Sequence, residues 1–578
     1  MPRIHRITHD NELVRRKVNF FADYFVFAAE TAGTNDLVEI DNALSTTDKI
    51  IFQITKNPNR CSAYIDSYLT HVSFEDYDDF KNHKVYQKLQ SLIIQYAANK
   101  KPKHKINWVQ SKPEFLKVLK LYRRELKRIM FKKALNSIIS YLRCVHEIEE
   151  HKSDLINQTN IIVSEFILND RSKRDIAGIF ERIITREVGI FPFPKFVKNQ
   201  DEKENFIKNR TFHQQFDGIY NFLKEKLNEN YFLFRIYGLK TPDNFEFTYN
   251  RVTFYSSKHE KLQVLLNKIR EDKYNADFLV NDEYLMFATI KSEYGSIDAA
   301  VSFAIEAINT ELKFINKVFA SNCTLEKFSY LLTSNFVDIG YHRNLKDKGH
   351  RIDNNEGRLL EDNPYVFLKK SPKRFTEVLL KNESIYIEAL TNRNIATYWQ
   401  YLETIIPSKQ NDEKQIIDIV SHLLLLNADS YYKNRLKGYI IDAISPLTAN
   451  HDDLGITIDR QLEIFNSQKS IDWTVLSTEI KHPFISHLIA DFLKPLKKND
   501  LVNRRKFYQR VLWDTQAQRN SIIHRGYANE KAMISLNGSL PRLITRLRWT
   551  LFNGIREKVG LDYNDMVLKL RDRASLLV

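Results

Sequence analysis

Residues 113–130 read PEFLKVLKLYRRELKRIM, and this stretch decides the fold class. Its apolar residues recur at helical spacing, while Lys and Arg fill the opposite face. The stripe consists of Phe115, Leu116, Leu119, Tyr122, Leu126, Ile129 and Met130. We therefore predict an amphipathic helical stretch from Pro113 to Glu150. Its basic face is either a solvated surface or a contact for RNA.

The helical pattern continues on both sides of this stretch. Residues 1–165 are predicted to be a helical N-terminal region, and residues 373–578 a helical bundle with an insertion near 449–500. The helices expected in the bundle cover 374–406, 413–427, 430–444, 502–523 and 541–559. Pro541 is expected in the first turn of the last helix, a position that favours proline.

The middle of the chain has a different pattern, with short runs of aromatic and β-branched residues between turn signals. We expect strands at 231–237, 245–255 and 284–291, followed by an amphipathic helix at 297–318. These elements predict a small α/β module at 166–340. Residues 341–372 are rich in Lys, Asp, Asn, Gly and Pro and are expected to form a surface linker.

The composition agrees with a mainly α protein. The chain has 578 residues, of which 43% are hydrophobic, and this length exceeds what one hydrophobic core normally supports. Glycine (15 residues) and proline (14) are scarce, which favours helices over turns and sheet. We therefore predict a globular protein of several domains.

Charge points to a possible polyanionic partner. The formal net charge is +15, and residues 501–560 alone hold twelve Lys or Arg against three Asp or Glu. A basic surface of this kind attracts nucleic acid, although solubility alone would also explain it. The position of the basic stretch matters more than its size, because it surrounds the motif described below.

The cysteines and the apolar runs bear on location. Cys61, Cys144 and Cys323 are far apart, which argues against a disulfide framework or a zinc cluster and fits a reducing cytoplasm. The first residues lack the apolar stretch of a signal peptide, and runs such as 423–426 are far too short to cross a membrane. We expect a cytoplasmic protein that uses no metal and no cofactor.

One segment carries chemistry: residues 516–527, QAQRNSIIHRGY. The motifs of P-loop, dinucleotide-binding, zinc-protease and esterase sites are absent from the sequence. In this segment Arg519 is followed by Asn520 and, four residues later, by His524. On a helix, residues at i and i+4 share a face, so Asn520 and His524 point together. Arg519 is long enough to reach the same side.

The segment resembles the nuclease signature of the HEPN superfamily, an Arg followed after four to six residues by His. The same spacing occurs by chance at Arg3 to His9 and at Arg343 to His350. A second similarity distinguishes the copy at Arg519. Residues 393–403, RNIATYWQYLE, are similar to the first bundle helix of Apea-like HEPN domains, where an aromatic residue precedes Leu-Glu. The resemblance covers roughly residues 370–578.

The resemblance implies a metal-independent endoribonuclease that acts as a homodimer. The residue types suit that chemistry: His524 can transfer protons, and Arg519 can stabilise charge on the phosphoryl oxygens. The nucleophile is the 2′-OH of RNA, so DNA is not a substrate. Glu403 is a weaker candidate that orients a site residue, and as a bundle or surface glutamate it would have no such role.

Neighbouring arginines are candidates for a phosphate track, chiefly Arg505, Arg510, Arg525 and Arg546, with Arg504, Arg542 and Arg548 nearby. HEPN proteins of this size often serve anti-phage (abortive infection) or toxin systems, so the resemblance implies a phage-derived trigger or inhibitor. Residues 1–340 would then sense the trigger or hold the nuclease off. Two alternatives stay open: a catalytically silent HEPN module that binds RNA or a protein, and a helical scaffold in which the motif is coincidental.

Overall fold

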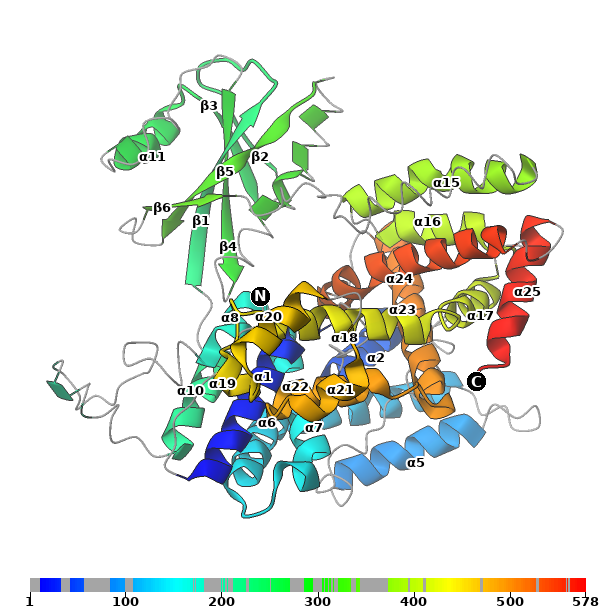
Figure 1. Ribbon diagram of the computed structural model, residues 1–578. Coiled ribbons are helices and arrows are strands. Elements are labelled where there is room, and N and C mark those ends of the chain that lie inside the picture. The colour runs from blue at the N-terminus through cyan, green and yellow to red at the C-terminus, as the bar shows by residue number, and fades with distance from the viewer. Residues whose placement is uncertain are drawn as a thin grey trace. The chain divides into compact units, whose positions relative to one another are not determined.

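The computed structural model contains a helical unit and a smaller unit built on a β-sheet (Figure 1). The helical unit comprises residues 1–168, 177–220 and 359–578, and the sheet unit comprises residues 169–176 and 221–358. Apart from a few residues between these ranges, the structure describes 11–32, 42–56, 84–98, 108–169, 173–180, 212–224, 228–249, 251–270, 285–294, 321–333, 339–343, 373–392, 395–408, 412–467, 471–525, 530–557 and 562–578. The protein is mainly α with a small α/β module, as predicted.

The N-terminal part of the helical unit has helices α1 (Glu12–Thr31), α2 (Ala43–Lys56), α5 (Lys84–Ala98), α6 (Trp108–Arg143), α7 (Ile148–Leu168) and α10 (Phe212–Lys224). The apolar stripe from Phe115 to Met130 lies on α6. Its residues Phe115, Leu119, Tyr122 and Leu126 are buried in a core shared with α2 and α5. This confirms the amphipathic helix but not its predicted end at Glu150, because α6 ends at Arg143 and α7 begins at Ile148.

The C-terminal part has helices α15 (Lys373–Asn392), α16 (Ile395–Ile405), α17 (Glu413–Leu423), α18 (Ala428–Ile444), α23 (Lys498–Arg525), α24 (Glu530–Arg556) and α25 (Tyr563–Ser575). Their apolar faces meet in one large core that includes Trp399, Tyr401 and Tyr508. The prediction for α24 was wrong about its start, because the helix begins eleven residues before Pro541. Ala532, Leu536 and Leu540 are buried, and their packing extends the helix through the proline.

The insertion near 449–500 is helical rather than irregular. It forms α19 (His451–Leu454), α20 (Ile458–Asn466), α21 (Trp473–Glu479) and α22 (Pro483–Leu493). The side chains of Asn450, Thr457 and Asp472 cap the first three of these helices by accepting backbone N–H bonds. Such caps favour short helices that a hydrophobic pattern alone does not predict.

The insertion also explains why the two helical regions form one unit. Phe484 of α22 packs edge-on against Phe20, Tyr24 and Phe27 of α1. Between the same two helices, Nε2 of His482, the residue that precedes α22, lies 3.4 Å from Oδ2 of Asp23 on α1. Residues 1–165 and 373–578 were expected as separate regions, but they lie in one compact unit. Aromatic packing between such distant segments is not visible in either segment alone.

A second connection joins the N-terminal helices to α23. Lys49 of α2 and Asp514 of α23 form an ion pair of 2.7 Å, and their side chains are 0% and 2% exposed. Ala517 of α23 is buried in the core of α2, α5 and α6, and Trp513 is packed against it as well as against the C-terminal core. Helix α23 therefore lies between the two halves of the helical unit.

The sheet of the smaller unit has the strand order β2-β3-β4-β1-β5-β6, and each neighbouring pair is antiparallel. The strands are β1 (Asn228–Tyr237), β2 (Glu246–Tyr249), β3 (Val252–Ser256), β4 (Leu285–Tyr294), β5 (Thr324–Thr333) and β6 (Ile339–Arg343). Helix α11 (Glu260–Arg270) packs on one face through Leu262 and Leu266. The other face packs against Ala304, Ile305, Ile308, Leu312 and Ile315, which are helical.

The sheet unit differs from the prediction in three respects. Residues 245–255 were expected as one strand, but Tyr249 pairs with Val252, so the segment is the hairpin β2–β3. Strands β5 and β6 were not predicted. The expected linker, 341–372, begins inside β6, and the remainder of it lies outside the described residues.

Candidate functional site

Helix α23 carries the motif, and its buried residues fix which side of the helix reaches solvent. Tyr508, Val511 and Leu512 are buried in the C-terminal core. Thr515, Gln518 and Ser521 are fully buried as well. The side of α23 that reaches solvent lies near the C-terminal end of the helix. There Arg519 and Asn520 are partly exposed and Ile523 is 53% exposed.

Arg519 is held by two groups. Its Nη1 donates a hydrogen bond of 2.9 Å to Oδ1 of Asn520, and its Nη2 lies 3.8 Å from Oε1 of Glu403 on α16. The Arg519 side chain is 26% exposed and that of Glu403 is 19% exposed. The guanidinium is therefore oriented by neighbours while part of it stays in contact with solvent.

Glu403 is itself held in place by a hydrogen bond from a core residue. The indole Nε1 of Trp399, one helical turn earlier on α16, donates a hydrogen bond of 2.7 Å to Oε1 of Glu403. Trp399 is fully buried in the C-terminal core. A continuous chain of polar contacts thus runs from a core tryptophan through Glu403 and Arg519 to Asn520.

This chain joins the two segments on which the sequence resemblance rests, residues 393–403 and 516–527. They are more than a hundred residues apart in sequence, and the contact between Glu403 and Arg519 connects them. The sequence predicts that Trp399 packs in the bundle rather than stacking on RNA. Its spacing of four residues from Glu403 on a helix is the signal that could have revealed the supporting hydrogen bond.

His524 lies on α23, one turn after Asn520. The side chains of His524 and Arg525 fall outside the described residues, so the structure does not test their predicted roles. The backbone of α23 does continue through both positions. Asn520 and His524 therefore occupy positions i and i+4 of a continuous helix.

Comparison with family models, with curated proteins and with solved structures finds no match to this chain.

Of the arginines expected on a phosphate track, Arg546 is in the interior. Its side chain donates to the hydroxyl of Tyr508 at 3.1 Å and to the carbonyl of Leu424 at 2.9 Å, and its guanidinium lies over the ring of Tyr431. Arg546 is 7% exposed and Arg510 is 5% exposed. The prediction that Arg510 and Arg546 contact phosphate was wrong, because a buried guanidinium cannot contact an RNA backbone. Both are structural residues.

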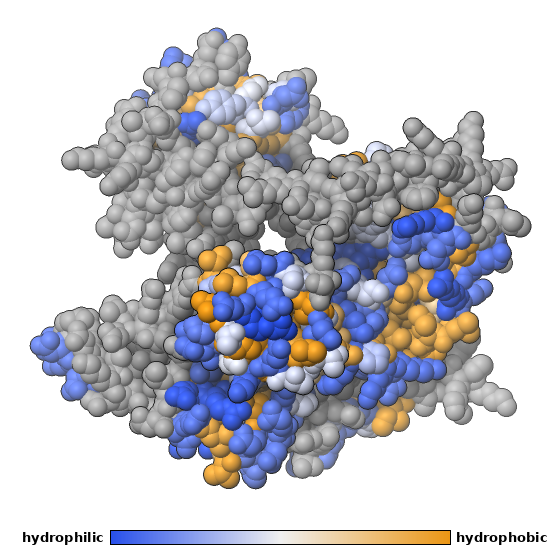
Figure 2. Space-filling model, in the orientation of Figure 1, coloured by the Kyte–Doolittle hydropathy of each residue, from blue (hydrophilic) through white to orange (hydrophobic). Residues whose placement is uncertain are grey.

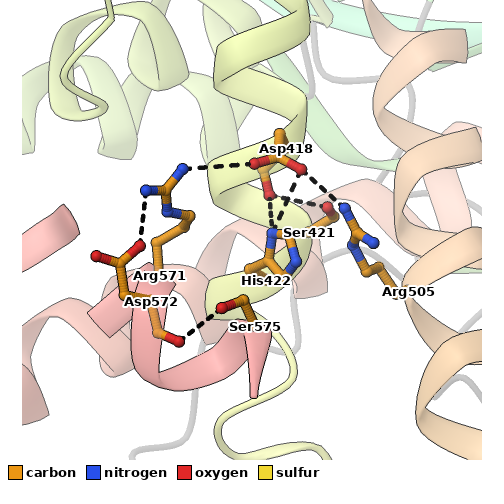
Figure 3. Close-up of polar contacts among 7 residues, drawn as sticks. All are labelled: Asp418, Ser421, His422, Arg505, Arg571, Asp572 and Ser575. Atoms are coloured by element: carbon orange, nitrogen blue, oxygen red, sulfur yellow. Dashed lines mark hydrogen bonds and ion pairs between the residues drawn. The ribbon is translucent and has the colours of Figure 1, made fainter. Parts of the chain in front are cut away.

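Arg505 is engaged in a cluster of charges centred on Asp418 of α17 (Figure 3). Its Nη2 donates to Oδ1 of Asp418 at 2.8 Å, while Arg571 of α25 lies 3.9 Å from Oδ2. The hydrogen bond from His422 and the charge of Arg505 lower the pKa of the Asp418 carboxyl. The cluster holds α17, α23 and α25 together, so Arg505 is a structural residue in the first place.

Two further arginines are also engaged. Arg548 forms two hydrogen bonds with Glu383 of α15, at 2.6 and 3.2 Å, and its side chain is 11% exposed. Arg504 lies over the ring of Tyr432, 4.5 Å from its centroid. Much of the positive charge counted in residues 501–560 therefore stabilises the bundle. The sequence could not reveal this, because the carboxylates and rings that hold these arginines come from α15, α17 and α18.

Within the described residues, no helix is both long enough and apolar enough to cross a membrane. On the face seen in Figure 2, small apolar areas alternate with hydrophilic ones over the helical unit.

Proposed function

We propose that this protein is a metal-independent endoribonuclease that cleaves RNA by attack of the 2′-OH on the neighbouring phosphate. Arg519, Asn520 and His524 form its active site, and Glu403 is a positioning residue. The observation that carries the proposal is the contact of Glu403 with Arg519, because it unites two segments that were selected separately for their likeness to HEPN nucleases.

Each residue has a distinct task in this reaction. The imidazole of His524 transfers a proton, either from the 2′-OH or to the departing 5′-oxygen. The guanidinium of Arg519 stabilises the negative charge that grows on the phosphoryl oxygens, and its planar N–H donors match phosphate geometry. Asn520 and Glu403 orient that guanidinium before substrate arrives, so little of its freedom has to be lost in the reaction.

The reaction needs both a base and an acid, and one copy of the motif supplies one histidine. We therefore propose a homodimer in which the second histidine comes from the partner subunit. A role in anti-phage defence or as a toxin, with a phage-derived trigger, belongs to the same proposal. In such a role, the N-terminal helices that contact α23 would be the route by which a trigger acts on the active site.

The experiment is to incubate the purified full chain with total RNA in EDTA and to examine the fragment ends. We expect cleavage that persists in EDTA and leaves 2′,3′-cyclic phosphates. His524→Ala should lower the rate about 10²–10⁴-fold, the usual contribution of acid–base catalysis. Arg519→Ala should lower it about 10²–10³-fold.

The matched control is Arg460→Ala on α20. Arg460 is also a partly exposed arginine held by carboxylates, those of Glu463 and Glu479, and it lies outside the proposed site. Its removal should leave cleavage unchanged. Cleavage that requires a divalent ion and leaves 5′-phosphates would point to a metal-dependent nuclease instead.

A second candidate function is a silent module that binds RNA or a protein without cutting. The observation in its favour is the same contact, since a carboxylate 3.8 Å from Arg519 reduces the positive charge offered to a phosphate. Binding of RNA without fragments, in a folded protein and at the highest concentrations tested, would favour this function.

A further inference from the structure

A group of metal-binding side chains lies at the turn between α6 and α7, far along the chain from Arg519. No metal site was expected from the sequence, but His146, Glu150 and His151 each offer one ligand atom, and these atoms all lie within 4.8 Å of one another. Nδ1 of His146 is 3.0 Å from Oε2 of Glu150. We propose that these three residues bind a divalent transition-metal ion of the zinc class.

The residue types select this class of ion. Imidazole nitrogens and a carboxylate are typical ligands of Zn²⁺, with distances of about 2.0–2.2 Å, so ligand atoms bound to one ion are roughly 3.3 Å apart. The spacing of His146 and Glu150 already suits this geometry, and the ligand atom of His151, within 4.8 Å of the other two, has to move closer to complete the set. Mg²⁺ and Ca²⁺ prefer oxygen ligands and are disfavoured by two imidazoles.

The backbone that carries these ligands is fixed from inside the protein. Lys17 of α1 is 2% exposed, and its Nζ donates to the carbonyl of Cys144 at 2.6 Å and to Sγ of the same residue at 3.4 Å. A buried ammonium therefore anchors the end of α6, two residues before His146. On α7, the ring of His151 stacks on Tyr141, with centroids 5.2 Å apart and planes at 22°.

The site is open to solvent on its outer side. The side chains of His146 and Glu150 are 54% and 56% exposed, so an ion can enter and water can complete its coordination. Segment 146–151 reads HEIEEH, so Glu147 and Glu149 add negative charge to the same short stretch of chain. Three protein ligands with an open position describe a site that binds metal reversibly, in contrast to a closed four-ligand structural site.

The test is a titration of the metal-free full chain with Zn²⁺, read by competition with a chromogenic chelator. We expect the wild-type chain to bind one Zn²⁺ more than the double variant His146→Ala/His151→Ala. Loss of a residue that only supports a ligand lowers metal affinity about 10–100-fold, so Glu150→Gln should cost at least about tenfold. Mg²⁺ should not compete.

The matched control is His451→Ala. His451 is likewise partly exposed and lies 3.3 Å from a carboxylate, that of Asp452, but it belongs to no such group of three among the described residues. Its removal should leave Zn²⁺ binding unchanged. If the double variant unfolds, Glu150→Gln alone decides, because its side chain is exposed. Equal Zn²⁺ binding by the wild type and Glu150→Gln, or none by the wild type, overturns the proposal. The readout involves no RNA, so it is independent of the proposed nuclease activity.

Discussion

Lys49 and Asp514 form an ion pair of 2.7 Å in the interior of the helical unit, where their side chains are 0% and 2% exposed. The pair joins α2 in the N-terminal region to α23 only five residues before Arg519. The pair therefore links α2 directly to the helix that carries the proposed active site.

The first prediction is that Lys49→Met strongly destabilises the protein. Removing one member of a buried ion pair leaves the other charge in an apolar environment, which typically costs about 3–5 kcal/mol. The free energy of unfolding should be measured by urea denaturation. The double variant Lys49→Met/Asp514→Leu removes both charges and should recover much of the loss. A Lys49→Met chain as stable as the wild type would show that the pair contributes nothing.

The second prediction concerns Glu403 as a positioning residue. Glu403→Gln preserves the size of the side chain and an oxygen for the Trp399 indole, but it removes the charge that faces Arg519. Misplacement of a catalytic group by about 1 Å can cost about 10²-fold in rate, so we expect kcat to fall by about 10–100-fold with little change in KM.

The matched control for Glu403→Gln is Glu479→Gln, because Glu479 contacts Arg460 at 2.9 Å in the same manner outside the site. It should leave kcat unchanged. If Glu403→Gln cleaves RNA at the wild-type rate while Arg519→Ala does not, Glu403 has no positioning role.

The third prediction concerns pH. Burial lowers the pKa of His487 from 6.5 to about 4, although Asp491 opposes this shift and Lys152 and Lys494 add to it. The unfolded chain thus binds a proton that the folded chain excludes, and the folded protein loses stability as pH falls from about 6.5 towards 4. From pH 7.5 to 5.5 this single group should cost about 1 kcal/mol.

Urea denaturation at the two pH values measures that loss. His487→Gln should reduce the difference between them, whereas His451→Gln, at a histidine that is 35% exposed, should not. Identical pH dependence in the wild type and His487→Gln would show that this imidazole is not the source.

The sequence predicted what depends on local pattern. The stripe on α6 and the strands β1 and β4 follow from periodicity within a single segment, and they were placed close to their observed bounds. The candidate site could also be predicted in part from local sequence. Arg519 and Asn520 are adjacent, and Glu403 is the last residue of the segment 393–403.

What depends on distant partners was not predicted. Arg546 reads as a surface cation until Tyr431, Tyr508 and Leu424 are seen around it. The union of the two helical regions likewise depends on Phe484 of the insertion meeting α1, and neither sequence segment indicates the other. Whether a charged residue is buried depends on the residues that pair with it. A single sequence does not show which residues form such pairs.

The last prediction is a homodimer formed around the end of α23. The sequence suggests the apolar residues around Trp513, Ile522 and Trp549 as its contact surface. The side chain of Trp513, however, packs against the cores of both halves of the helical unit and must be removed from that surface. Ile523 is the better anchor, because it is 53% exposed on the motif helix beside His524. Two-fold pairing would bring two copies of this residue, and two motif helices, to one interface.

Ile523→Glu should therefore weaken the dimer and reduce RNA cleavage together, since a buried charge opposes association. Ile458→Glu is the matched control, because Ile458 is 52% exposed on α20, away from the motif. Light scattering across a dilution series measures the dimer, and the cleavage assay is run on the same samples. Excess His524→Ala chains mixed with wild type should suppress activity by forming mixed dimers. A wild-type chain that cuts RNA while scattering as a monomer would contradict the shared site. The second proton-transfer group would then have to lie in the same chain, with Glu403 as the first carboxylate to test.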